Sequence, residues 1–127
     1  ILFLEPAMSA NLGVPSALEP LTGESGKRDP QQAYAPHGYD LVTDTTSTDL
    51  ISNERVALIF RRHAEMARKL QLPMLVGEWG AYYGNPAAAE PARFTMRLFH
   101  ELGCGSLYWA YRRELETSPL LRSLSPQ

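Results

Sequence analysis

The sequence predicts an α/β fold in which parallel strands alternate with helices. Short apolar runs recur along the chain without strict alternation, which is typical of strands buried on both faces of a parallel sheet. The segments between the later runs carry apolar residues at helical spacing, so they predict crossover helices. The predicted strands are residues 1–4, 32–36, 74–78 and 106–111, and the predicted helices are residues 52–70, 86–102 and 118–124.

Composition favours one folded domain. Hydrophobic residues make up 44% of the chain and charged residues 20%, which argues against disorder. The net charge of −2 predicts no nucleic-acid partner, and no apolar run is long enough for a membrane span. Cys104 is the only cysteine, so an internal disulfide and a thiolate zinc site are both excluded. No GxGxxG motif follows a strand, and we expect no cofactor and no metal.

The first predicted strand, residues 1–4, is followed by Glu5 and Pro6, and it ends there because proline cannot donate a hydrogen bond to a neighbouring strand. The chain opens inside this apolar run, without Met or a charged leader, so we expect it to be a piece of a longer protein. Glycine and proline recur through residues 7–31, which predicts a long loop with a helical turn.

The second strand, residues 32–36, is weakly apolar, and residues 41–51 after it are rich in Thr and Asp and predict a loop. Ser52 is placed to cap the next helix, and Glu54 in its first turn suits the helix dipole. The helix after the third strand has Pro91 near its start and Gly103 just past its end. Proline and glycine favour these positions.

The carboxyl ends of the predicted strands carry acidic and aromatic side chains and one histidine. These residues are Glu5, His37, Tyr39, Glu78, Trp79, Trp109 and Tyr111. In a parallel α/β sheet or barrel, the carboxyl ends of the strands carry the chemistry. Sugars suit this mixture, because their C–H faces stack on indoles and their hydroxyls bond to carboxylate, imidazole and phenol groups. The strand ends therefore predict a carbohydrate site.

Four motifs at these ends resemble a known family. They are FLEP at 3–6, APHGYD at 35–40, GEWG at 77–80 and LYWAY at 107–111. In this order they resemble the C-terminal half of a glycoside hydrolase family 5 barrel, and FLEP and YAPHGYD most resemble its endoglycoceramidase-related branch. The resemblance implies half of a TIM (β/α)8 barrel, strands five to eight with their helices, as a single (β/α)4 domain over residues 1–127.

The resemblance also implies roles for individual residues. Glu78 matches the catalytic nucleophile of a retaining glycosidase, which forms a glycosyl-enzyme intermediate. Tyr39 would hydrogen-bond Glu78 and help to keep it ionised, and His37 would orient the sugar or the acid. Trp109 would form the floor of the subsite that holds the cleaved sugar, and Trp79 is predicted to bind substrate beside Glu78.

The sequence departs from the family at the acid/base. The family's acid/base glutamate follows an Asn at the end of strand four, which this chain lacks, and the pair Asn53-Glu54 begins a helix instead. A retaining glycosidase needs a second carboxyl group roughly 5 Å from the nucleophile. Glu5 is a candidate for that group, although its position in the family looks like a substrate-side or structural residue. We predict that Glu5 binds substrate.

Plainer interpretations of the same residues stay open. Glu78 is also compatible with a strand-end carboxylate that caps the next helix, His37 with a loop histidine bonded to backbone, and Trp109 with a core side chain.

Two functions follow from these alternatives. The first is a retaining β-glycosidase half-barrel that acts on glucoside or glycolipid-like substrates and lacks its own acid/base. The second is an inactive half-barrel that binds carbohydrate or only self-assembles. Because four βα units leave two open sheet edges and an exposed inner face, we expect a homodimer or higher homo-oligomer in either case.

Overall fold

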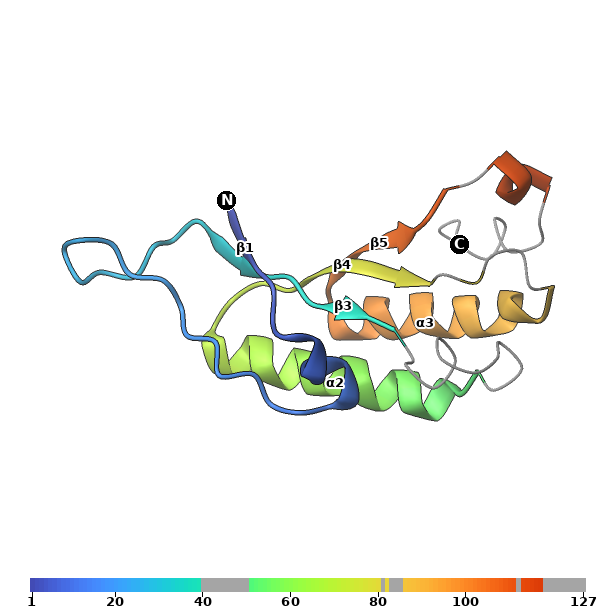
Figure 1. The fold of residues 1–127 in the computed structure, drawn as a ribbon, viewed down its shortest axis with the longest axis horizontal. Coiled ribbons are helices and arrows are strands. Elements are labelled where there is room, and N and C mark those ends of the chain that lie inside the picture. Colours follow the sequence, from blue (N-terminus) through green and yellow to red (C-terminus); the bar gives the residue numbers. More distant parts are fainter. Residues whose placement is uncertain (40–50, 81, 83–85, 112, 118–127) are drawn as a thin grey trace.

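The computed structural model describes residues 1–39, 51–80, 82, 86–111 and 113–117, and it is an α/β fold (Figure 1). The predicted helix 118–124 and almost all of the predicted loop 41–51 lie outside the described residues. The elements in chain order are β1 Leu2–Leu4, η1 Met8–Leu12, β2 Gln32–Tyr34, β3 His37–Gly38, α2 Asn53–Leu70, β4 Leu75–Gly80, η3 Pro86–Ala88, α3 Ala89–Leu102, β5 Gly105–Trp109 and η4 Arg113–Thr117.

The strands pair in chain order, and every pair of named strands is parallel. β1 pairs with β2, and β3, β4 and β5 form a second sheet in that order. β2 and β3 are consecutive parts of one extended segment, divided where Pro36 has no N–H to donate. The Tyr34 N–H donates to the Pro73 carbonyl and the Gly77 N–H donates to the Pro36 carbonyl, both at 2.9 Å. These bonds run the segment alongside β4 across the division, so four chain segments lie side by side.

Both long helices cover the same side of the strands, as Figure 1 shows. α2 begins as predicted, because the Ser52 hydroxyl accepts from the Arg55 N–H at 3.3 Å. α3 ends as predicted at Gly103, whose φ of 66° places it in the left-handed region that favours glycine. No helix among the described residues is both long and apolar enough to cross a membrane.

The hydrophobic core lies between the helices and β4. The Phe60 ring of α2 meets the Phe99 ring of α3 edge to face, with ring centroids 4.6 Å apart. Val76 and Trp79 of β4 are fully buried against these helices. Of the described elements, no helix covers the opposite side of β5, and there Leu107 and Trp109 are 57% and 48% exposed. The sheet therefore has one packed face and one open face.

The long N-terminal loop is anchored at two points. Residues 13–31 fold back on themselves through an antiparallel bridge between Thr22 and Arg28. The Arg28 guanidinium donates to the carbonyls of Leu70 and Gln71, so it caps the carboxyl end of α2. The buried amide of Gln32 bonds to Leu21 through both its oxygen and its nitrogen. The predicted loop is confirmed, and its predicted helical turn is η1.

Candidate active site

Four of the predicted site residues lie together where the strands end. His37 on β3 is in register with Glu78 on β4. Glu5 follows β1 directly, and Tyr39 follows β3 directly. Parallel strands in sequential order bring these positions to one edge, as expected for the carboxyl ends of a parallel sheet. The structure therefore gathers side chains that are as far as 73 residues apart in the sequence, Glu5 and Glu78.

An irregularity in β4 sets the direction of the Glu78 side chain. Val76 pairs with Ser106 and Trp79 with Tyr108, so β4 holds one residue more than β5 over this interval. In a regular strand, residues three apart point to opposite faces. Here Val76 and Trp79 are both buried in the core that faces the helices. The extra residue thus turns Glu78 towards the open face, which is a common use of a β-bulge beside a site.

Three contacts hold the Glu78 carboxylate and its surroundings. The Tyr39 hydroxyl donates to Glu78 Oε2 at 2.8 Å. His37 Nδ1 lies 3.6 Å from the same oxygen and 3.2 Å from Glu5 Oε1. The side chains of His37 and Glu78 are about one-third exposed and that of Glu5 about half exposed. A ligand can therefore reach the group from solvent.

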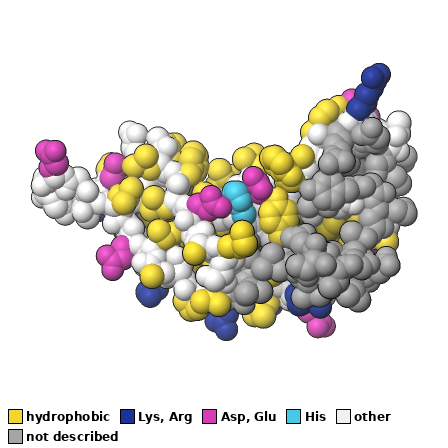
Figure 2. Space-filling view, in the orientation of Figure 1, with side chains coloured by type: hydrophobic (Ala, Val, Ile, Leu, Met, Phe, Trp, Pro, Cys, Tyr) yellow, Lys and Arg dark blue, Asp and Glu magenta, His cyan; other side chains and the backbone are white. Residues whose placement is uncertain are grey.

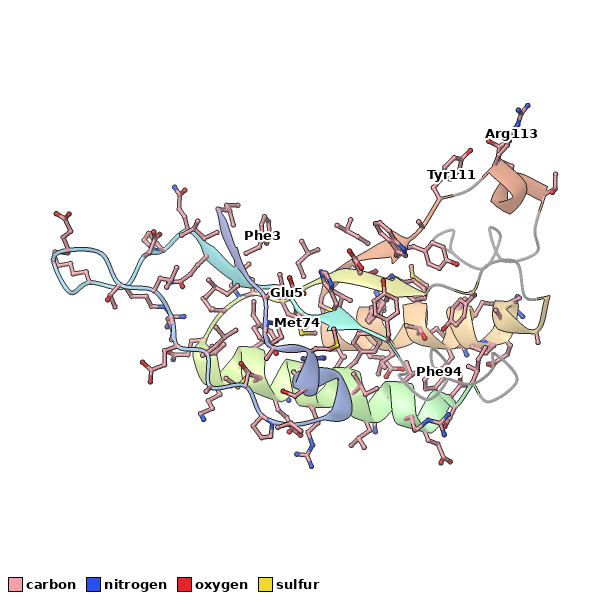
Figure 3. The ribbon with its side chains drawn as sticks, in the orientation of Figure 1. Phe3, Glu5, Met74, Phe94, Tyr111 and Arg113 are labelled. Carbon is pink, nitrogen blue, oxygen red and sulfur yellow. The ribbon has the colours of Figure 1, made fainter. Side chains whose placement is uncertain are left out.

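The surface around this group is apolar. Figure 2 shows a histidine between two acidic side chains, with hydrophobic side chains on either side of them. Phe3 is 56% exposed, and Figure 3 places it near Glu5, as the alternation along β1 requires. This combination of exposed rings and a few charged groups is typical of a surface that binds a small ligand.

Trp109 presents its indole on the same open face. Along β5, Ser106 and Tyr108 are more covered than Leu107 and Trp109, and Tyr108 packs against the core residue Trp79. Because side chains alternate along a strand, Trp109 points away from the helices, towards the face that carries Glu78. The plain-core interpretation of Trp109 does not fit this position, because its side chain is half exposed.

Trp79 is predicted to bind substrate, and its position in the structure contradicts this prediction. Its side chain is only 1% exposed and packs edge to face between Phe99 and Tyr108, with ring centroids 5.2 Å from each. The physical reason is the extra residue in β4, which turns Trp79 towards the helices and Glu78 away from them. Trp79 is a core residue that fixes the strand carrying Glu78.

Gly77 is a site residue that the sequence analysis did not single out. A Cβ atom there would lie 3.1 Å from Cδ2 and Nε2 of His37, tighter than an ordinary contact. The imidazole therefore lies against the Gly77 backbone, and a glycine immediately before the strand-end acid was the signal that could have revealed it. Among the described residues, no group of three or more His, Cys, Asp or Glu side chains is arranged to hold a metal.

Known proteins resemble this structure over nearly all of its length. No family model and no curated protein sequence matches the chain. Endo-glycoceramidase II from Rhodococcus sp., solved with a cellobiose-like imidazole, has a TM-score of 0.75 at 25% identity, and its lactosyl-enzyme intermediate has a TM-score of 0.71 at 26% identity. The similarity covers 96% of this chain in both cases, but only 30% and 29% of those chains.

A second enzyme shares the fold at lower similarity. A hyperthermophilic endo-beta-1,4-glucanase in complex with substrate has a TM-score of 0.57 at 19% identity, over 82% of this chain and 41% of that chain. The present chain thus spans less than half the length of each solved structure described here. Its mixed α/β fold with parallel strands resembles part of a TIM-barrel glycosidase of glycoside hydrolase family 5, as the sequence motifs predict.

Proposed function

We propose that this chain carries the nucleophile side of a retaining β-glycosidase site, with Glu78 as the nucleophile. The observation that carries the proposal is the Glu78 carboxylate itself, which is held by Tyr39, opens to solvent and shares a face with Trp109. The substrate class is a β-glucoside or a glycolipid-like glycoside. Similarity to enzymes solved with cellobiose-like, lactosyl and ganglioside ligands supports this class.

The proposed reaction begins with attack by a Glu78 oxygen on the anomeric carbon. The new carbon–oxygen bond forms as the bond to the aglycone breaks, and the aglycone leaves with that electron pair. Water then attacks the same carbon, releases the sugar and restores the carboxylate. The Tyr39 hydroxyl holds the Glu78 carboxylate in position by donating to it, and the Trp109 indole offers a face for the sugar ring.

In the proposed reaction, the acid/base does not come from this chain. Leaving groups such as sugars and lipids need a proton as they depart, and an acid typically accelerates that step 10²–10⁴-fold. Good leaving groups such as nitrophenolate need little help. We therefore propose that the isolated chain cleaves an activated glycoside once and then turns over slowly.

We also propose that the chain is a half-barrel that is completed by self-association, as a homodimer or higher homo-oligomer. Among the described strands, β1 and β5 each have a partner on one side only, and Leu107 lies exposed on the open face. A second copy would cover both features. Light scattering on a size-exclusion column tests this proposal, and a monomer at micromolar concentration would rule it out.

A second candidate function is an inactive half-barrel that binds carbohydrate or only self-assembles. It is favoured by the position of Glu5, the other carboxylate in the group, which lies against His37 rather than standing free as a proton donor. This candidate predicts sugar binding without release of any aglycone.

A nitrophenyl β-glucoside distinguishes the two candidates. The enzyme proposal predicts a rapid release of about one nitrophenol per chain, followed by a much slower phase. Glu78→Gln should abolish the release and leave sugar binding nearly unchanged. The matched control is Glu101→Gln, which alters an exposed carboxylate at the end of α3. Release that persists in Glu78→Gln would remove Glu78 as the nucleophile.

A further inference from the structure

One nitrogen atom of His37 faces two carboxylates. Nδ1 lies 3.2 Å from Glu5 Oε1 and 3.6 Å from Glu78 Oε2. Glu5 comes from the end of β1 and Glu78 from β4, on opposite sides of the segment that carries His37. A neutral imidazole has one N–H donor and one bare nitrogen. A bare Nδ1 would direct its lone pair at two anionic oxygens, so the hydrogen belongs on Nδ1.

The ring has little freedom to escape this arrangement. Cδ2 and Nε2 of His37 lie against the Gly77 backbone, where even a methyl group would be crowded. The hydrogen-bond acceptors around an imidazole decide which of its nitrogens carries the hydrogen, and both carboxylates lie beside Nδ1. Glu5 is the nearer of the two, by 0.4 Å.

We propose that Glu5 is a positioning residue for Glu78, acting through His37. Glu5 takes the larger share of the Nδ1 hydrogen, and Glu78 Oε2 is left with the Tyr39 hydroxyl as its main donor. Without Glu5, the Nδ1 hydrogen turns wholly to Glu78. An oxygen that accepts two strong hydrogen bonds holds its electrons more tightly, and its attack on a sugar carbon is slower. This role rests on the proposed function of Glu78, whereas the hold of Glu5 on His37 does not.

The hold of Glu5 on His37 is tested without any activity, by NMR of the chain labelled with ¹⁵N histidine. The chain has three histidines, so their ring signals can be assigned by substitution. The expected result is that His37 carries its hydrogen on Nδ1 in the unaltered chain and in Glu78→Ala, and loses this preference in Glu5→Ala/Glu78→Ala. An unchanged His63 signal shows that each variant is folded. Loss of the Nδ1 hydrogen in Glu78→Ala alone would overturn the proposal.

The effect on Glu78 is tested by the rate of the first nitrophenol release. Glu5→Ala is expected to slow this release about tenfold, the effect of about 1.4 kcal/mol on a barrier, with KM unchanged. Glu5→Gln should restore most of the rate, because an amide oxygen also accepts the Nδ1 hydrogen. Glu101→Ala is the matched control and should leave the rate unchanged.

Other roles for Glu5 predict different patterns, and each would overturn the positioning role. If Glu5 donates a proton to the leaving group, Glu5→Gln fails as badly as Glu5→Ala, and the loss grows with poorer leaving groups. If Glu5 mainly binds sugar, KM rises in both variants. If the unaltered chain releases no nitrophenol, the proposed function fails, while the NMR result still decides whether Glu5 holds His37.

Discussion

Acidification from pH 6.5 towards pH 4 is expected to destabilise this fold through the buried imidazole of His63. His63 lies on α2, is 2% exposed, and its Nδ1 is 2.9 Å from the Tyr34 hydroxyl oxygen. Its Nε2 has no hydrogen-bond partner among the described residues. Burial disfavours the charged imidazolium and lowers the pKa of His63 from 6.5 to about 4.

The sign of the effect follows from proton binding in the two states. Between pH 4 and 6.5, the unfolded chain binds a proton at His63 and the folded chain does not. The contribution of His63 to stability is therefore complete above pH 6.5 and is lost as the pH falls towards 4. At about 1.4 kcal/mol for each unit of pKa difference, the loss across the window is about 3 kcal/mol. Such a loss is a large part of the stability of a small domain.

Urea unfolding at a series of pH values measures this loss. Carboxylates also titrate at the acid end, so the informative quantity is the difference between the unaltered chain and His63→Gln, which keeps an acceptor for the Tyr34 hydroxyl. We expect the variant to lose about 3 kcal/mol less than the unaltered chain between pH 6.5 and 4. The control His100→Gln, at the exposed end of α3, should follow the unaltered chain. Parallel curves for all three proteins would show that protonation of His63 does not cause the acid destabilisation.

Three further predictions concern the site and its support. Tyr39→Phe removes the 2.8 Å hydrogen bond that holds the Glu78 carboxylate in position for attack, and it should slow the first nitrophenol release about tenfold, measured by stopped flow; an unchanged rate would contradict this orienting role of the phenol. Gly38→Ala would drive a methyl group into the Phe60 ring and should cost about 1–3 kcal/mol of stability, seen as a lower melting temperature. Arg28→Gln removes the guanidinium from the carboxyl end of α2 and should lower the free energy of unfolding in urea by about 1–2 kcal/mol. An unshifted urea midpoint would show that this contact does not stabilise the fold.

Local chemistry made the helices predictable from the sequence. Ser52 and Gly103 mark ends that the structure confirms, because a hydroxyl cap and a left-handed glycine are properties of single residues. The strand-end positions of Glu78 and His37 were predictable for a related reason. Parallel strands place their carboxyl ends at one edge, whatever their exact lengths.

The features that the sequence did not reveal depend on contacts between segments that are far apart in the chain. The extra residue in β4 turns Trp79 into the core and Glu78 towards the open face. A bulge is defined by the pairing of β4 with β5, so the sequence of β4 alone does not reveal it. Likewise, the contact of Arg28 with the end of α2 joins residues 42 and 43 apart, so the long loop looks unanchored in the sequence. The contact of Glu5 with His37 is a further case, because it spans two strands.

Trapping the proposed covalent intermediate tests whether Glu78 is the nucleophile. A dinitrophenyl 2-deoxy-2-fluoro-β-glucoside has a leaving group that needs little acid help, and its fluorine slows release of the sugar from the enzyme. We expect the intact mass to rise by one fluoroglucosyl group per chain, fragmentation to place this group on Glu78, and Glu78→Gln to stay unlabelled. A label on any other residue, or a chain that binds the sugar and gains no mass, would contradict it.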